Sequence, residues 1–166
     1  KKEVTMNLEL KLAYDEKDEI KKLFTEYTNM LVETNPQMAI YLEIQNYDDE
    51  LLHLEKKYGI PDGRLYIAYI DEKPAGCVAL RKLDDTKCEL KRLFVRPEFR
   101  GQNLGHILIK QIIDDAKSIG YESLFLDTLP FLKSAIHLYK SFGFKETEPY
   151  NNSPVDTTIF MKLKLK

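Results

Sequence analysis

Apolar residues in the middle of the chain gather in three segments that the pattern predicts to be strands. These segments are residues 64–70, 74–82 and 87–95. Only the short stretches 71–73 and 83–85 separate them. Because turns this short join strands that run antiparallel, we expect a three-stranded antiparallel meander.

Ahead of the meander, the pattern predicts one strand and two helices. Residues 8–12 alternate leucine with charged residues, which is the period of a half-buried strand. A helix is predicted from Asp15, with an apolar stripe at intervals of three and four that comprises Ile20, Leu23, Phe24, Tyr27 and Leu31. A weaker helix is predicted over 48–58, ended by the glycine and proline that follow it. The joint between the two helices, at residues 35–36, has no clear pattern.

Behind the meander, helical and strand periods alternate. Leucine, isoleucine and alanine recur at helical spacing from Leu104 onwards, which predicts an amphipathic helix that ends at Gly120. A short apolar strand follows at 123–128, then a helix at 133–142 and a final strand at 156–165. The order βααβββαβα, with a terminal β-region, predicts one mixed α/β layer structure.

Length and composition fit a single folded domain. A chain of 166 residues corresponds to about one domain, and 43% hydrophobic with 31% charged residues excludes general disorder. We assign the domain to residues 6–166, and we expect residues 1–5 to be an added or disordered segment ahead of a natural start at Met6. No apolar run approaches the ~18 residues of a membrane span, and no signal-peptide core follows the charged start. We therefore expect no membrane partner.

Charge, cysteine and histidine content narrow the function further. The chain has 25 Lys and Arg against 27 Asp and Glu. Its net charge of −2 argues against a dedicated nucleic-acid binder, which needs an excess of basic residues. Cys77 and Cys88 cannot form a disulfide framework and fit the reducing cytoplasm, where we expect the protein. His53, His106 and His137 lack the spacing of metal ligands, so we expect no metal.

The stretch V-R-P-E-F-R-G-Q-N-L-G, residues 95–105, is the most informative part of the chain. It joins the end of a predicted strand to the start of the long amphipathic helix. The first turn of a helix has unpaired N–H groups and a positive dipole, and Gly101 and Gly105 let an anion approach the main chain closely. The loop therefore suits a phosphate or pyrophosphate, although such a turn is also an ordinary connection. It contains neither G-x-x-x-x-G-K-S/T nor G-x-G-x-x-G, which argues against a P-loop nucleotidase and a dinucleotide fold.

Two motifs resemble the GNAT superfamily of N-acetyltransferases. The loop is similar to the acyl-CoA loop of that superfamily, Q/R-x-x-G-x-G/A, with Arg100 first and Gly105 last. Asn103 replaces the middle glycine, and asparagine tolerates left-handed backbone better than most residues. The segment 135–139 with the Gly-Phe pair at 143–144 resembles the superfamily's A-x-x-L-Y-x-x-x-G-F pattern. The element order extends the resemblance over nearly the whole chain.

The resemblance implies a fold and an acetyl-CoA site. The fold would be a single α/β domain with a mixed, mostly antiparallel sheet, flanked by helices and carrying one splayed parallel strand pair. The pantetheine arm would enter that splay. Backbone groups of three strand residues would bind the arm, and the loop would hold the pyrophosphate. The implied residues are Leu93, Phe94 and Val95 for the arm, and Arg100, Gly101, Gln102, Asn103, Leu104 and Gly105 for the pyrophosphate.

The resemblance also implies a base near the acceptor. An amine with a pKa near 10 is only about 0.1% neutral at pH 7, a deficit of about 4 kcal/mol. Glu89 resembles the strand glutamate that serves as base in some members of the superfamily, directly or through a water. A merely exposed or paired strand carboxylate is the alternative interpretation of Glu89. Asp127 is a second, weaker candidate for the base.

Tyr139 matches the tyrosine that is the usual general acid of the superfamily. Full proton transfer from a phenol to the CoA thiolate is uphill by roughly 2 kcal/mol, and a hydrogen bond to the developing charge is the alternative to full transfer. Without the resemblance, Tyr139 would be interpreted as a core aromatic. Tyr27, Tyr41, Tyr47 and Tyr150 lie in segments that, by the same resemblance, wall the acceptor pocket, although core packing or surface exposure also explains each of them.

These observations predict a GNAT-type N-acetyltransferase that moves acetyl from acetyl-CoA to the primary amine of a small-molecule or amino-acid-like acceptor. The expected mechanism is direct attack in a ternary complex. A peptide or protein amine is the alternative acceptor. A non-catalytic acyl-CoA sensor, hinted at by Asn103, is the alternative function. A homodimer is compatible with the resemblance, although no residue pattern marks an interface.

Overall fold

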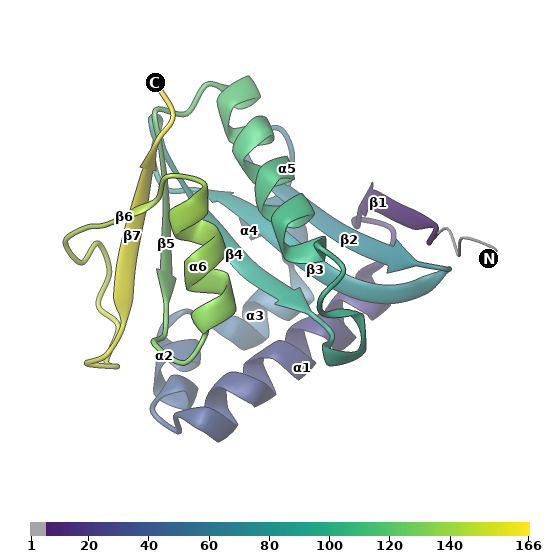
Figure 1. The fold of residues 1–166 in the computed structure, drawn as a ribbon. Coiled ribbons are helices and arrows are strands. Elements are labelled where there is room, and N and C mark those ends of the chain that lie inside the picture. The colour runs from purple at the N-terminus through teal and green to yellow at the C-terminus, as the bar shows by residue number, and fades with distance from the viewer. Residues whose placement is uncertain (1–5) are drawn as a thin grey trace.

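A seven-stranded mixed sheet forms the centre of the molecule, in the order β1-β2-β3-β4-β5-β7-β6 (Figure 1). The computed structural model describes residues 6–166, so the expectation for residues 1–5 lies outside the described part of the chain. All neighbouring strands are antiparallel except β4 and β5, which are parallel. The strands are β1 (Leu8–Leu12), β2 (Arg64–Ile70), β3 (Lys73–Lys82), β4 (Lys87–Val95), β5 (Ser123–Thr128), β6 (Lys145–Glu146) and β7 (Ile159–Lys164).

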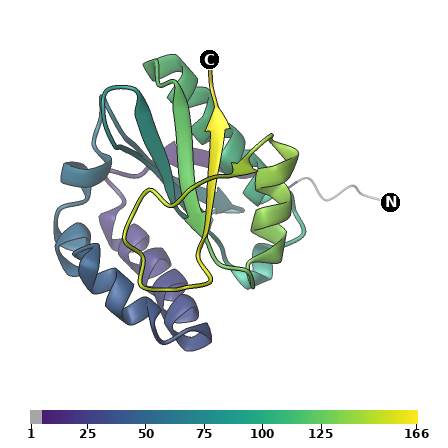
Figure 2. The same cartoon turned by 90° about the vertical axis from the view of Figure 1, so that its left-hand side faces the viewer.

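Helices cover both faces of this sheet (Figures 1 and 2). Four lie on one face, namely α1 (Lys17–Thr34), α2 (Met38–Ile44), α3 (Tyr47–Leu52) and α4 (Leu54–Tyr58). On the other face are α5 (Leu104–Ile119) and α6 (Lys133–Ser141), and a short 3-10 helix, Pro97–Phe99, precedes α5. The mixed α/β fold with one parallel strand pair is confirmed.

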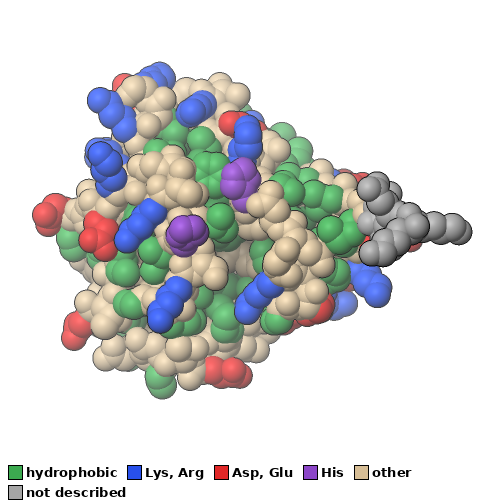
Figure 3. Space-filling view, viewed as in Figure 1, with side chains coloured by type: hydrophobic (Ala, Val, Ile, Leu, Met, Phe, Trp, Pro, Cys, Tyr) green, Lys and Arg blue, Asp and Glu red, His purple; other side chains and the backbone are tan. Residues whose placement is uncertain are grey.

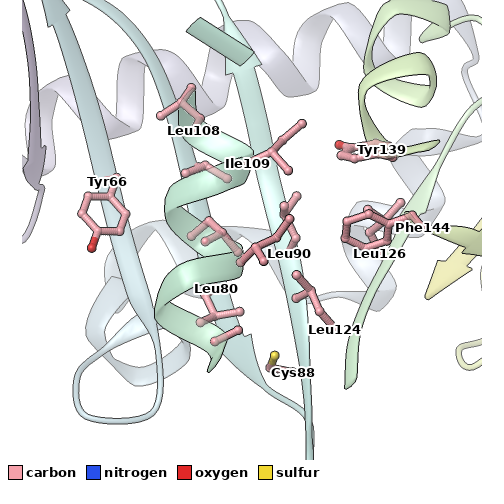
Figure 4. Close-up of a cluster of buried hydrophobic side chains, with 14 of the residues drawn as sticks. Tyr66, Leu80, Cys88, Leu90, Leu108, Ile109, Leu124, Leu126, Tyr139 and Phe144 are labelled. Carbon is pink, nitrogen blue, oxygen red and sulfur yellow. The ribbon is translucent and has the colours of Figure 1, made fainter. Parts of the chain in front are cut away.

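Two apolar clusters hold the layers together. Beneath α5, leucines and isoleucines of the helix pack on buried residues of β3, β4 and β5, including Leu80, Leu90 and Leu124 (Figure 4). Cys88 is fully buried in the same cluster. Beneath α1, the predicted stripe packs on residues of β2 and β3, except for Leu31, which belongs to a third, smaller cluster. Each large side chain buried in this way contributes about 1.5–3 kcal/mol, which fixes the helices over the sheet.

The N-terminal elements differ most from the predictions. The single helix predicted over 48–58 is two helices, because the backbone leaves helical geometry at His53 (φ −134°, ψ 59°). Helix α2 was not predicted. The first helix begins at Lys17 rather than Asp15 because residues 14–15 form a turn. In β1, Leu8 and Leu12 are more than a third exposed, since β1 is an edge strand of the sheet.

The C-terminal elements agree more closely with the pattern. Strands β2 to β5 and helices α5 and α6 match their predicted ranges within one residue at most ends. The last strand begins at Ile159 instead of residue 156, because the chain turns there and the Thr158 N–H donates to the carbonyl of Val155. The two-residue strand β6 was not predicted.

Candidate active site

The parallel strands β4 and β5 separate soon after they begin. They pair only at Lys87 with Ser123, Cys88 with Leu124 and Glu89 with Phe125. Beyond these positions the strands diverge, as Figure 1 shows. The second half of β4 therefore offers backbone N–H and C=O groups that β5 does not use, and such groups need another partner. The structure contains the splay that the resemblance implied.

A β-bulge at Arg92 bends β4 at this point. Cys77 pairs with Phe94 but Ala79 pairs with Lys91, so two residues of β4 stand opposite one residue of β3. Arg92 is the bulged residue, with a φ of 58°. A bulge bends its strand and changes which side chains share a face. As a result, the side chains of Lys91 and Arg92 both contact residues of the α1–α4 side.

A cavity of about 400 Å³ lies where the acetyl-CoA site was expected. Its walls come from the end of β4, the loop before α5, the start of α6 and α1. Eight of the nine predicted residues line it, namely Leu93, Phe94, Val95, Arg100, Gly101, Asn103, Leu104 and Gly105. The ninth, Gln102, does not line it, and among residues 6–166 its buried Oε1 has no hydrogen-bond partner. Several Lys and Arg side chains lie on this face of the molecule, over α5 and α6, which suits a ligand with phosphates (Figure 3).

The loop before α5 has the geometry of an anion cradle. Gly101 and Asn103 both adopt left-handed backbone, with φ of 80° and 65°. Asn103 is the N-cap of α5, so the unpaired N–H groups of the first turn begin directly after it. Asn103, at the position of the middle glycine of the pattern, thus adopts a conformation that asparagine tolerates better than most residues. A Cβ on Gly105 would come within 3.0 Å of the Leu138 side chain, so the approach between α5 and α6 is close.

Tyr139 lies beside a second, smaller cavity of about 40 Å³ between β4 and β5. Its ring packs edge-on against Phe144 at 5.7 Å between centroids (Figure 4). Burial raises the pKa of the Tyr139 phenol well above its usual value, with smaller contributions from Tyr27 and Asp127. The phenol is therefore protonated at neutral pH and available as a hydrogen-bond donor.

Glu89 does not line the small cavity. Its side chain is buried, and the Tyr150 hydroxyl donates to its Oε2 at 2.5 Å. Arg81 Nη1 lies 3.5 Å from its Oε1. Figure 2 shows the segment that carries Tyr150, between β6 and β7, on the α1–α4 side of these strands. Glu89 would therefore reach an acceptor through a water or after Tyr150 moves.

Asp127, the weaker candidate for the base, does line the small cavity. Its Oδ2 accepts hydrogen bonds from the Tyr41 hydroxyl and from Asn151 Nδ2, the latter at 2.8 Å. Tyr27 and Tyr41 line the cavity as expected for pocket walls. Tyr150 contacts Glu89 instead, and Tyr47 packs on the Arg92 guanidinium at 5.1 Å. Asn151 had no signal in the sequence, because a long loop brings it to β5.

A buried charge cluster next to the small cavity was not predicted. Arg92 donates to both carboxylate oxygens of Glu50, at 2.9 and 3.0 Å, and Lys57 donates to Glu50 Oε1 at 2.6 Å. Burial opposes the ionisation of Glu50, but Arg92 and Lys57 outweigh it and lower the pKa of Glu50 to about 2. Gln45 Oε1 accepts from Arg92 at 2.8 Å and from Lys91 at 3.3 Å. Regular strand alternation would have separated Lys91 from Arg92, and only the bulge brings them together.

Residues 6–166 contain neither a group of metal ligands nor a helix that could span a membrane. No group of three or more His, Cys, Asp or Glu side chains there could hold a metal ion. None of the helices within that range is long and apolar enough to cross a bilayer.

Known proteins are similar to this chain in sequence and in fold. Residues 20–144 match the Acetyltransferase (GNAT) family. An uncharacterized N-acetyltransferase of Schizosaccharomyces pombe is 43% identical over 150 residues, covering 89% of this chain and 88% of that protein. An acetyltransferase structure from Streptococcus agalactiae has a TM-score of 0.75 at 24% identity, covering 95% of this chain and 98% of that one. A GNAT family acetyltransferase from Elizabethkingia anophelis with acetyl-CoA bound has a TM-score of 0.53 at 26% identity, covering 63% of this chain and 77% of that one.

The family match spans most of the chain and includes both the loop before α5 and the segment around Tyr139. The relative from S. pombe supports the same assignment over nine tenths of the sequence. The chain therefore belongs to the GNAT family of acetyltransferases and is an N-acetyltransferase of that type.

Proposed function

We propose that this N-acetyltransferase moves the acetyl group of acetyl-CoA onto the primary amine of a small, amino-acid-like acceptor, by direct attack in a ternary complex. The observation that carries the proposal is a pair of adjoining cavities at the splay of β4 and β5. The two cavities share Tyr27, Leu93 and Leu132 in their walls. The smaller one, about 40 Å³, has Tyr139 and Asp127 in its walls and would receive the reacting end of the acceptor.

The larger cavity would hold acetyl-CoA, which supplies the activated thioester. Backbone groups at Leu93, Phe94 and Val95 that face away from β3 would bind the amides of the pantetheine arm in place of a neighbouring strand. The first turn of α5 and the left-handed residues Gly101 and Asn103 would hold the diphosphate. Arg100 adds positive charge at the same cavity.

Acid–base chemistry would come from residues in or near the walls of the smaller cavity. The acceptor must lose a proton before its nitrogen lone pair can attack, and Glu89 would accept that proton through a water. Asp127 remains the alternative base because it lines the cavity directly. Tyr139 would donate its phenolic proton, or a hydrogen bond, to the sulfur as the C–S bond breaks.

The test is to incubate the protein with acetyl-CoA and a panel of small primary amines while thiol release is followed. Turnover above the rate without acceptor would support the proposal. Tight binding of acetyl-CoA without turnover on any acceptor would favour the acyl-CoA sensor. Turnover only with peptide amines would favour the peptide alternative.

A further inference from the structure

Lys91 is a buried cation that no carboxylate of the described residues neutralises. It is 7% exposed and lines the small cavity between β4 and β5. Its ammonium donates to Gln45 Oε1 at 3.3 Å, and no carboxylate of residues 6–166 lies within ion-pairing distance. A buried charge is costly unless an opposite charge compensates it. The side chain therefore has the chemistry to attract an anion into the cavity.

The carboxylates nearest to Lys91 already pair with other basic side chains. Both carboxylate oxygens of Glu50 accept from Arg92, and one also accepts from Lys57. With Lys91, this cluster holds three cations against the single carboxylate of Glu50. Burial lowers the pKa of Lys57 to about 8, and repulsion from Lys91 and Arg92 adds to this effect. Attraction by Glu50 acts in the opposite direction and only partly offsets it. The next acidic residue on the strand, Glu89, is paired with Arg81.

The opposite wall of the same cavity has the opposite charge. Asp127 on β5 accepts hydrogen bonds from Tyr41 and Asn151, which are both neutral. No Lys, Arg or His within the described range pairs with Asp127. Helix α2 connects Asp127 with Lys91. Tyr41 of this helix contacts Asp127, and Gln45, one turn later at the end of the helix, contacts Lys91. The cavity therefore has a basic side chain on its β4 wall and an acidic side chain on its β5 wall.

We propose that Lys91 binds the carboxylate of the acceptor, and that the acceptor is an amino acid whose free carboxylate lies a few bonds from its primary amine. This inference rests on the proposed function and narrows its substrate class. The acceptor enters as a zwitterion, with its ammonium toward Asp127 and its carboxylate toward Lys91. Gln45 orients the Lys91 ammonium. Amino groups at a protein N-terminus or on a protein lysine have no such carboxylate nearby and are poor acceptors.

The experiment compares matched acceptors that differ by one carboxylate. The pairs are L-histidine and histamine, L-phenylalanine and phenethylamine, and L-alanine and ethylamine, each at saturating acetyl-CoA. Thiol release gives kcat and KM for each acceptor. The wild-type protein is expected to favour the amino acid by about tenfold or more in kcat/KM for at least one pair, since a charge-assisted contact contributes about 1.5–3 kcal/mol.

Substitutions of Lys91 test whether this residue causes the preference for amino acids over amines. Lys91→Met should reduce the amino-acid preference of the favoured pair about 10- to 100-fold, mainly by raising KM for the amino acid. Lys91→Arg, which keeps the charge, should retain most of the preference. Lys164→Met removes an exposed lysine from β7 and should keep the wild-type ratio. Thermal unfolding of Lys91→Met should show no loss of stability, because the variant removes an uncompensated charge.

The assays distinguish an error in the role of Lys91 from an error in the proposed function. If the wild-type protein acetylates the amines as well as the amino acids, or if Lys91→Met leaves the ratio at its wild-type value, the role of Lys91 is wrong while the proposed function stands. If no acceptor in the panel releases thiol, the proposed small-amine function fails and this inference fails with it.

Discussion

Tyr139 combines a protonated phenol with a ring fixed by packing, so its hydroxyl can be removed without disturbing the fold. Burial raises the pKa of Tyr139 well above its usual value. Tyr139→Phe keeps the contact with Phe144 and removes only the donor. We expect kcat to fall about 10²–10³-fold while the Kd for acetyl-CoA changes little.

A second buried tyrosine provides the control for that measurement. The Tyr121 hydroxyl donates to the carbonyl of Asp62, away from both cavities. Tyr121→Phe should cost about 1 kcal/mol of stability and leave kcat at its wild-type value. Equal losses of kcat in both variants would contradict a specific role for Tyr139.

The identity of the base can be determined from pH profiles. In Glu89→Gln only acceptor molecules that are already neutral can react, so kcat/KM should rise about tenfold per pH unit between pH 7 and 9. The wild-type profile should be flatter over this range. If Asp127→Asn has the steep profile and Glu89→Gln has the wild-type profile, the role of base belongs to Asp127.

At the scale of elements, the N-terminus of α5 depends on a loop with left-handed backbone. Alanine at Gly101 strains the loop by roughly 1–2 kcal/mol, because an L side chain disfavours a φ of 80°. We expect Gly101→Ala to weaken acetyl-CoA binding severalfold, as measured by titration calorimetry. Gly120, at the other end of α5, has a φ of 109° and lies outside the cavity. Gly120→Ala should therefore lose similar stability but bind acetyl-CoA like wild type; weaker binding in Gly120→Ala as well would point to general destabilisation.

The ion pairs of Glu50 connect α3 and α4 to the bulge of β4 and make this connection sensitive to acid. The pKa of Glu50 falls from 4.5 to about 2 on folding, which corresponds to about 3 kcal/mol of stabilisation. Because the folded pKa is the lower one, this stabilisation is complete above about pH 5 and is lost as the pH falls toward 2. In urea unfolding, Glu50→Gln should be about 3 kcal/mol less stable than wild type at pH 7. The difference should shrink from pH 5 to pH 3, and a difference independent of pH would contradict the assignment.

Elements with local signals could be predicted from the sequence. Helix α5 repeats its apolar residues at helical spacing and ends at Gly120, and the strands of the meander are separated by short turns. The loop before α5 could be assigned because its motif is contiguous. Tyr139 could be proposed as a site residue in the same way, from a motif within one helix.

Features that depend on distant residues could not be predicted. The bulge at Arg92 has no sequence signature, because arginine rarely takes a positive φ. Without the bulge, strand alternation places Lys91 and Arg92 on opposite faces and hides the buried charge cluster. The contact between Glu89 and Tyr150 joins residues 61 positions apart across a loop of irregular structure. The sequence therefore predicted only some of the charged and polar residues around the smaller cavity.

At the scale of the whole molecule, the sheet consists of two parts that meet at three residue pairs. Strands β1 to β4 form one part and β5, β7 and β6 form the other. Beyond the paired residues, no strand within residues 6–166 pairs with the backbone of β4 on the β5 side. A ligand that binds this free edge, the first turn of α5 and the start of α6 would connect the two parts.

We therefore expect acetyl-CoA to stabilise the protein globally and to protect the free edge locally. At a ligand concentration of 100 times Kd, the free energy of unfolding should increase by about 2.7 kcal/mol, which corresponds to a rise in Tm of roughly 5–10 °C. Among Leu93, Phe94 and Val95, hydrogen exchange of the amides that face away from β3 should slow more than at Lys87–Glu89, where β4 is already paired with β5. Pantetheine, which lacks the diphosphate, should protect the same strand residues but raise Tm less, because it does not reach the loop before α5. Protection confined to another part of the sheet would show that the splay is not where acetyl-CoA binds.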